Sequence, residues 1–350
     1  MSKPRIAIAG FGQIGGKHAL ALAAASNCEI SAICDPDPTR EALTEPFRVP
    51  FFTDLSQMLD AERPDGVVVS AQTQVHMEIA TACVQRGIPC LVEKPFAVST
   101  SDARDLVALA GEKGVTLLTG HHRRHNRIVQ QAKDIVSGGQ IGRLVGVSAI
   151  WALRKHDSYY DTPWRTQPGA GPILTNLIHD VDTLRYICGE ISSISATTSS
   201  ATRGHAVEDT ASVTIAFENG ALGSVLITDA GQSPWGWEVN SEENPDYPVT
   251  ATNSTFITGT AGALGFPRLE LWTPAGGAEA QWFEPLNRQS ISTPGPDPLI
   301  AQAEHFARVI ADGEAPLVSG REGARTLACI EAVFESARTG ATAKPDFDGL

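Results

Sequence analysis

The sequence has few basic residues and no long apolar run. Its 27 lysines and arginines stand against 40 aspartates and glutamates, which gives a formal net charge of −13 at pH 7. A protein of that charge repels polyanions, so we expect neither a nucleic-acid partner nor binding to an anionic membrane. No apolar run approaches the roughly 18 residues that a membrane-spanning helix needs, so the sequence predicts no membrane span.

Cysteine motifs are also missing. The six cysteines form no C-x-x-C pair, and no Cys/His spacing resembles a zinc site, so the sequence predicts no metal centre. Isolated cysteines of this kind are typical of buried, reduced thiols in a cytoplasmic protein. The apolar run near the N-terminus is short and broken by glycines, which does not match a signal peptide. We therefore expect a cytoplasmic location.

The first strong motif lies in residues 5–18. An alternating apolar run at residues 6–9 predicts a buried strand, and residues 17–22 predict a helix. Between them stands G-x-G-x-x-G, a spacing that turns a strand tightly into a helix and lets a pyrophosphate approach the helix N-terminus. The expected cofactor contacts of this loop are Gly10, Phe11, Gly12, Gln13, Ile14 and Gly15.

A second apolar run, residues 30–34, ends in Asp35, 20 residues after Gly15. A carboxylate at this spacing accepts hydrogen bonds from a ribose 2′-hydroxyl and repels a 2′-phosphate. Arg40 follows closely enough to soften that preference. The sequence thus predicts a dinucleotide site that takes NAD, with NADP as the less favoured cofactor.

The pattern of elements divides the chain into two predicted domains, 1–121 and 122–350. Strand and helix signals alternate through the first of these, as in a parallel sheet with helices on both faces. Longer strands follow, with Asn219-Gly220 as a hairpin turn. Two helices, at about residues 297–311 and 321–339, are expected to close the chain.

Residues 231–252 interrupt the strands of the second predicted domain. They are rich in proline, glycine, asparagine and tryptophan. Such a composition is typical of a loop. We expect a surface loop near a site or a subunit contact.

Two further stretches contain residues suited to proton transfer. Glu93-Lys94-Pro95 follows a predicted parallel strand, at the sheet edge where ligands bind, and a lysine there can exchange a proton with a substrate hydroxyl. The alternative is a surface lysine before a proline. In the helix that starts at Pro172, Thr175 and Asn176 lie one turn before His179. This histidine is either catalytic or a structural histidine beside an apolar stripe.

Together these motifs resemble a known family. G-x-G-x-x-G, Glu93-Lys94-Pro95, the glycine-rich turn leading to His179-Asp180, and residues 316–323 are similar to the glucose-fructose oxidoreductase and inositol dehydrogenase (Gfo/Idh/MocA) family. The resemblance covers nearly the whole chain. It implies an α/β Rossmann domain with a doubly wound parallel sheet, then an α+β domain with a large, open, mainly antiparallel sheet. It also implies a homodimer or homotetramer.

The resemblance assigns roles to individual residues. Lys94 matches the family's catalytic acid or base, and His179 matches a helical histidine that acts on the substrate hydroxyl. Many members carry an aspartate four residues before this histidine, where this chain has Thr175. Because threonine cannot hold a carboxylate's charge, an aspartate–histidine relay is in doubt. The further expected cofactor contacts are Arg40, Ala71, Gln72, His76, Glu93 and Lys94, although Ala71-Gln72-Thr73 replaces a Thr-Pro-Asn type of turn.

A mixture of donors, acceptors and aromatic rings stands where the family's substrate pocket would lie. Such a mixture suits a polyhydroxylated ligand. The expected substrate contacts are Arg123, His125, Asn126, Lys155, Tyr160, Trp164, Arg165, Thr175, Asn176 and His179. For Arg123 and Arg124 the alternative is a solvated pair of charges.

These expectations combine into one predicted activity. It is an NAD-dependent oxidoreductase that moves a hydride between nicotinamide and a secondary alcohol or ketone of a cyclic polyol or sugar, inositol-like or aldose-like. One alternative is a sugar-carbonyl reductase or a redox-neutral glycosidase of the same family. The other is a non-catalytic regulator that binds a dinucleotide.

Overall fold

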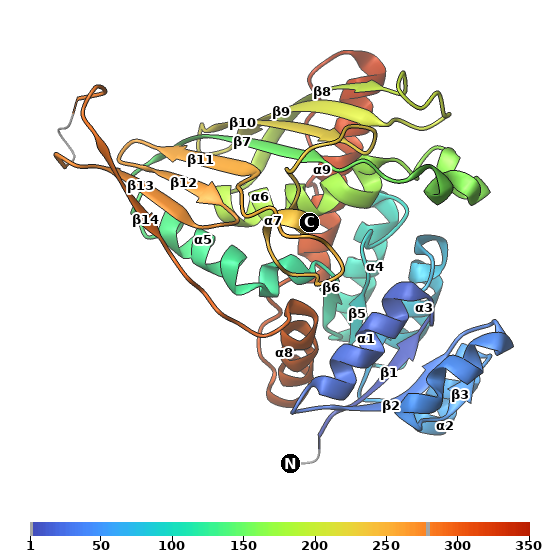
Figure 1. Ribbon diagram of the computed structural model, residues 1–350. Helices are drawn as coiled ribbons and strands as arrows, with labels where there is room; N and C mark the ends of the chain where they lie inside the picture. Colours follow the sequence, from blue (N-terminus) through green and yellow to red (C-terminus); the bar gives the residue numbers. More distant parts are fainter. Residues whose placement is uncertain (1–2, 278–280) are drawn as a thin grey trace. The chain divides into compact units, whose positions relative to one another are not determined.

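The computed structural model describes residues 3–277 and 281–350, which form two compact units (Figure 1). Unit 1 contains the chain up to Asn126 together with Pro296–Ala328 and Phe347–Leu350. Unit 2 contains Arg127–Gly295 and Cys329–Asp346. The sequence placed everything after residue 121 in the second domain. That assignment needs a correction, because the chain returns to unit 1 for two C-terminal segments.

A six-stranded parallel sheet forms the centre of unit 1. Its strands are β1 (Arg5–Ala9), β2 (Glu29–Cys34), β3 (Phe51–Phe52), β4 (Gly66–Val69), β5 (Cys90–Val92) and β6 (Leu117–Thr119). Their order is β3-β2-β1-β4-β5-β6, with parallel pairing throughout. The order reverses between β1 and β4, the point where open sheets of this kind bind ligands beyond their carboxyl ends. This sheet confirms the predicted Rossmann fold.

Helices of unit 1 cover both faces of this sheet. They are α1 (Gln13–Ala24), η1 (Pro38–Phe47), α2 (Leu55–Glu62), α3 (Thr73–Gln85), α4 (Thr100–Lys113), η2 (His122–His125) and α8 (Pro298–Asp312). Successive residues of β1 point to opposite faces. Ile6 and Ile8 join the core of α1 and α8, whereas Ala7 and Ala9 face the core under α2, α3 and α4.

Helix α8 completes the apolar core of unit 1, although it stands near the end of the sequence. Phe306 is fully buried in the same core as Ile6 and Leu22. The Glu304 carboxylate accepts a hydrogen bond from Ser26 Oγ at 2.9 Å, and the Glu304 carbonyl accepts one from Asn27 Nδ2 at 2.9 Å. Local periodicity predicted this helix, but a local pattern does not identify a partner nearly 300 residues away.

Unit 2 is built on an eight-stranded mixed sheet. Its strands are β7 (Leu144–Ala152), β8 (Ile191–Ser199), β9 (Thr210–Phe217), β10 (Leu222–Thr228), β11 (Thr255–Gly259), β12 (Ala263–Phe266), β13 (Glu270–Pro274) and β14 (Leu286–Ser290). Their order is β14-β13-β12-β11-β7-β10-β9-β8. β7 and β10 pair in parallel, and the other neighbouring strands of this sheet, including the hairpin at Asn219-Gly220, pair antiparallel. The large, mainly antiparallel sheet is confirmed.

The two faces of this sheet differ in character. Val213, Ile215 and Phe217 alternate along β9 and are buried on one face. On the other face Leu222 and Phe256 remain exposed. The helical segments of unit 2 are α5 (Arg127–Ser137), η3 (Asp157–Asp161), η4 (Pro163–Thr166), the π-helix η5 (Ile173–Leu177), α6 (Ile178–Cys188), α7 (Trp237–Asn240) and the residues from Cys329 onward of α9 (Gly320–Thr339).

Residues 231–252 are not simply a surface loop, which corrects the expectation for this stretch. They contain the short helix α7, in which Trp237 and Asn240 are buried. The Asn240 side chain accepts a hydrogen bond from the Gly236 N–H at 2.9 Å and donates to the Pro234 carbonyl at 2.9 Å. Two buried side chains and these bonds anchor a segment that composition alone had predicted to be a loop.

Candidate functional site

The glycine-rich loop of unit 1 has the shape that a dinucleotide requires. Gly10 has a φ of +95°, which favours glycine, and its carbonyl accepts a hydrogen bond from Ser70 Oγ at 2.8 Å. A side chain at Gly15 would overlap the Gly10 carbonyl, so α1 packs closely on β1 only because this residue is glycine. A Cβ at Gly12 would meet nothing within 4 Å. The open side of Gly12 and the start of α1 at Gln13 therefore fit a pyrophosphate.

Asp35 at the end of β2 supports this loop. Its carboxylate accepts the Phe11 N–H at 2.6 Å and the Asp37 N–H at 3.0 Å. Arg40 Nε lies 3.5 Å from the Asp37 carboxylate rather than beside Asp35. Asp35 keeps acceptor capacity beyond these two bonds, because a carboxylate has about four lone-pair sites. A ribose hydroxyl is a suitable donor to them.

His76 ties together the loops that follow β4 and β5. Its Nε2 lies 3.0 Å from the Ala71 carbonyl, and its Nδ1 lies 3.0 Å from the Pro95 carbonyl. Burial lowers the pKa of His76, although both carbonyls oppose the shift. The neutral ring donates to one of the two carbonyls at a time. Ala71 is half-buried and Gln72 is exposed, so these two residues border the loop that the histidine holds.

Glu93 fixes the start of the turn that carries Lys94. One of its oxygens lies 2.8 Å from His18 Nε2, and the other accepts the Lys94 N–H at 3.0 Å. Burial would raise the pKa of the Glu93 carboxyl, but the hydrogen bond from His18 and the charges of His18 and Lys94 outweigh it and lower the pKa to about 2. Glu93 is thus a buried anion that positions the half-buried Lys94 at the carboxyl end of β5.

Residues 121–126 lie inside unit 1. Arg123 and Arg124 are each 3% exposed, so the interpretation of these residues as a solvated pair of charges is wrong. Arg124 forms an ion pair with Glu322 at 3.0 Å. The ring of His125 packs on His305 with a centroid distance of 5.2 Å, and burial lowers the pKa of His125 to about 3. Asn126, at the end of this turn, is also buried.

In unit 2, the segment after β7 brings several expected substrate contacts together. Lys155 Nζ lies 3.5 Å from the Asp229 carboxylate and donates to Thr175 Oγ1 at 3.3 Å. Burial lowers the pKa of Lys155, and the charge of Asp229 opposes the shift. Arg165 stacks on the Tyr159 ring, with 4.1 Å from its guanidinium carbon to the ring centroid.

The helical segment that carries His179 begins with a π-helical turn, η5, where the sequence predicted a regular helix. The Glu208 carboxylate accepts the Ile173 N–H at 3.2 Å at the start of this turn. Thr175 Oγ1 lies 2.9 Å from the Gly171 carbonyl and 2.8 Å from Asn176 Oδ1. Thr175, Asn176 and His179 are half-buried, so each retains contact with solvent. Isolated π-turns in helices are frequent at functional sites.

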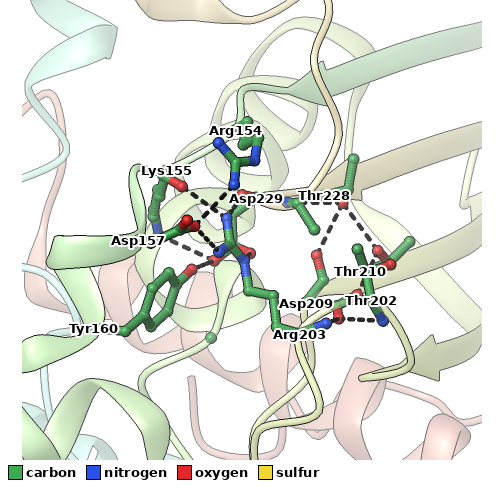
Figure 2. A network of polar contacts seen from close by, with 12 residues as sticks. Arg154, Lys155, Asp157, Tyr160, Thr202, Arg203, Asp209, Thr210, Thr228 and Asp229 are labelled. Atoms are coloured by element: carbon green, nitrogen blue, oxygen red, sulfur yellow. Dashed lines mark hydrogen bonds and ion pairs between the residues drawn. The ribbon is translucent and has the colours of Figure 1, made fainter.

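Asp229 and Arg203 are central to unit 2 but were not expected from the sequence (Figure 2). Asp229 follows β10 and is 2% exposed. It accepts a hydrogen bond from the Tyr160 hydroxyl at 2.6 Å, and Arg203 Nε lies 3.2 Å from its other oxygen. The signal available in the sequence for Asp229 was an aspartate directly after an apolar strand. Arg203 lies in a loop without any local pattern.

Within residues 3–277 and 281–350, the structure brings no three potential ligands among His, Cys, Asp and Glu together as a metal site. None of the helices in those residues is long and apolar enough to cross a membrane.

Comparison with known proteins places the chain in a family. A family model for the NAD-binding Rossmann fold of an oxidoreductase family matches residues 4–121, and a model of the GFO/IDH/MocA C-terminal domain matches residues 129–264. D-apiose dehydrogenase of Paraburkholderia graminis is 27% identical over 345 residues, which cover 96% of this chain and 88% of that protein. D-xylose 1-dehydrogenase (NADP(+)) 2 of Haloferax volcanii is 24% identical over 346 residues, covering 97% and 99%.

The solved structures agree at the level of the fold. The structure of levoglucosan dehydrogenase in complex with NADH and levoglucosan superposes with a TM-score of 0.81 at 22% identity, covering 98% of this chain and 100% of that one. The family match and the glycine loop together identify an oxidoreductase with an NAD(P)-binding Rossmann unit. The chain belongs to the GFO/IDH/MocA family, as its motifs predicted.

Proposed function

We propose that this protein is an NAD-dependent dehydrogenase that acts on a secondary alcohol of a sugar or cyclic polyol. The observation that carries the proposal is Lys94, set at the carboxyl end of β5 by the buried Glu93–His18 pair. Relatives that match almost the whole chain are named as dehydrogenases of the aldoses D-apiose and D-xylose, which supports a sugar substrate. Bound nicotinamide supplies the hydride acceptor or donor.

The chain's own residues handle the proton and orient the substrate. Lys94 takes the hydroxyl proton during oxidation and returns it during reduction, and His179 is the second proposed proton-handling residue. Thr175 contributes a hydroxyl where an aspartate would contribute a charge. The proposed hydroxyl-binding groups are Lys155, Tyr160, Trp164, Arg165, Thr175 and Asn176. The burial of Arg123, His125 and Asn126 favours a role in holding the turn after β6 rather than direct substrate contact.

The test is NADH formation at 340 nm with a panel of aldoses, inositols and anhydrosugars, with NADP in parallel. We expect absorbance to rise with one group of substrates. If NAD binds in calorimetry but no substrate yields NADH, the dehydrogenase proposal fails. Substrate cleavage without net NADH would then indicate a redox-neutral glycosidase, and the absence of any turnover a dinucleotide-binding regulator.

The proposed preference for NAD over NADP depends on Asp35 and can be tested there. Asp35→Asn removes the negative charge that repels a 2′-phosphate but keeps one oxygen for the Phe11 N–H. We expect the ratio of the NAD and NADP dissociation constants to shift toward NADP by at least about tenfold, or about 1.4 kcal/mol. Glu41→Gln, which removes an exposed charge from η1, should leave the ratio within about twofold. An unchanged ratio in Asp35→Asn would remove the basis for NAD preference.

We further propose that the protein is a homodimer or homotetramer that assembles through the open face of the unit 2 sheet. The central strands β7, β9 and β10 contain no charged residue, and Leu222, Leu226 and Phe256 on this face are 62%, 42% and 50% exposed. Subunit interfaces are depleted in charge at their centre. A sheet face with an uncharged centre of this kind suits a second copy of itself.

Phe256→Glu tests this assembly. A carboxylate in the middle of a desolvated sheet face is expected to dissociate the oligomer, so the mass measured by sedimentation should fall to that of one chain. Leu43→Glu places the same charge on η1, where Leu43 is 55% exposed, and should leave the mass unchanged. A monomeric wild-type protein, or equal dissociation by both variants, would contradict the proposed interface.

The state of the cysteines supports the expected cytoplasmic location. All six are free thiols, and all six side chains are buried. Burial raises the pKa of Cys28 and of Cys34 to about 11, which keeps both protonated and unreactive. A chain whose cysteines are all free and buried is typical of a reducing compartment.

A further inference from the structure

A polar cavity of about 460 Å³ opens in unit 2 beside the proposed substrate contacts. It lies where β7 and β10 end and the loop before β9 begins (Figure 2). Its lining residues are Arg154, Asp157, Tyr160, Asp161, Thr202, Arg203, His205 and Ala230. The volume falls in the range of small-molecule sites. Of these residues, only Tyr160 belongs to the proposed substrate contacts.

Arg203 is a fixed cation at the base of this cavity. Its side chain is 9% exposed. Nε pairs with the Asp229 carboxylate at 3.2 Å, and Nη2 donates to the Lys155 carbonyl at 2.8 Å. The loop behind it is also held, because the Thr202 and Arg203 N–H groups donate to the Asp209 carboxylate. These bonds leave Nη1 as the end of the guanidinium that is directed toward Asp157.

Asp157 occupies the space between two arginines. One of its oxygens lies 2.8 Å from Arg154 Nη2 and 3.5 Å from Arg203 Nη1. Its side chain is 79% exposed, so the carboxylate is held only weakly. Two guanidinium groups that converge on one oxygen form a receptor for a carboxylate. In this structure the exposed carboxylate of Asp157 occupies that receptor.

We propose that this cavity binds the carboxylate of an acidic sugar, a uronate or aldonate, and that Asp157 is a stand-in which the ligand displaces. The proposal rests on the proposed function, because it names the substrate class of the same site. The link is Asp229, which holds Arg203 of the cavity and also Lys155 and Tyr160 of the substrate contacts. A ligand carboxylate on the arginines would thus lie beside the groups that bind its hydroxyls.

The remaining lining fits such a ligand. Tyr160 and His205 pack ring to ring with a centroid distance of 5.0 Å and offer an apolar wall to a sugar ring. Asp161 is the other carboxylate of the lining, but it is exposed, so water and salt screen its repulsion. Displacing Asp157 would leave Arg154 Nη2 and Arg203 Nη1 without the carboxylate oxygen that they now share, and a ligand carboxylate would restore that pairing.

The test compares two substitutions of opposite expected sign. Asp157→Asn removes the stand-in charge and should lower the dissociation constant of uronates at least threefold. Arg154→Gln removes one of the receptor's arginines and should raise that constant about tenfold. Calorimetry without NAD measures D-glucuronate and D-galacturonate against D-glucose, D-galactose and glucose 6-phosphate. Glu218→Gln is the matched control, because it removes an exposed carboxylate from the opposite end of the β9–β10 hairpin and should change no constant more than twofold.

The outcomes separate this proposal from the proposed function. Tighter uronate binding in Asp157→Asn supports the carboxylate site, whether or not NADH is formed. The site is rejected if uronates bind no tighter than their neutral counterparts, if Asp157→Asn weakens them, or if glucose 6-phosphate is preferred. Oxidation of neutral polyols alone, with no uronate binding, would leave the dehydrogenase proposal intact and remove this one. Uronate binding without NADH formation from any substrate would do the reverse.

Discussion

Lys94→Met should lower kcat by about three orders of magnitude while NAD still binds. General acid–base groups contribute roughly 10²–10⁴-fold to rate, and methionine has similar length but no exchangeable proton. The change leaves the Lys94 N–H on Glu93 and the Glu93–His18 pair in place, so the turn after β5 should keep its shape. Steady-state kinetics with the best sugar of the panel and calorimetry with NAD measure the two quantities.

A second substitution at this position separates proton transfer from charge. Lys94→Arg retains the positive charge, but a guanidinium does not release its proton at neutral pH. It should therefore be nearly as inactive as Lys94→Met. Lys113→Met, on the exposed end of α4, controls for loss of a lysine. Full activity in Lys94→Arg would show that Lys94 contributes only charge, and full activity in Lys94→Met would exclude it from catalysis.

Gly12→Val should abolish NAD binding without destabilising the fold. The φ of Gly12 is −78° with a ψ of −160°, which valine adopts readily, and a Cβ there meets nothing within 4 Å. The open space next to this Cβ is where we expect the pyrophosphate, so the added methyl groups would exclude it. We expect the NAD dissociation constant to rise at least a hundredfold, about 2.7 kcal/mol. Calorimetry and thermal unfolding measure affinity and stability.

Gly16 provides the matched control for this prediction. It lies one turn further along in α1, and a Cβ there also meets nothing within 4 Å. Gly16→Val should retain NAD binding within about threefold and slightly favour the helix, since valine has a higher helix propensity than glycine. If both variants bind NAD normally, the pyrophosphate does not approach Gly12. If both unfold, the space around them is less open than the backbone indicates.

The Rossmann unit was predictable because its signals are local. G-x-G-x-x-G between a strand and a helix, and Asp35 at the end of the next strand, each lie within a few residues of the structure they specify. The hairpin at Asn219-Gly220 was predictable for the same reason. Strands β8 and β14 have no such local signal and were not predicted. β8 is rich in serine and threonine, and every residue of β14 is exposed, so neither has an apolar alternation.

The polar network of unit 2 was only partly predictable, because its members come from separate segments. Lys155 and Tyr160 stood out as polar and aromatic residues after a strand. Their common partner Asp229 follows another strand, and those two strands are neighbours only through the parallel pairing of β7 with β10. Such a pairing joins residues far apart in sequence and leaves no local trace. The importance of Arg203 follows only from its contacts in the folded chain, with Asp229 and with the Lys155 carbonyl.

The return of the chain to unit 1 has a consequence for its synthesis on the ribosome. Strands β1 to β6 emerge early, but Phe306 and its neighbours in α8, which complete the core over Ile6 and Leu22, emerge only after all of Arg127–Gly295. At roughly 5–20 residues per second this delay lasts about ten to thirty seconds. During that time the part of the apolar face that α8 later covers is exposed. A chaperone that shields apolar faces would therefore act on this chain after β6 has been synthesised and before α8 has emerged.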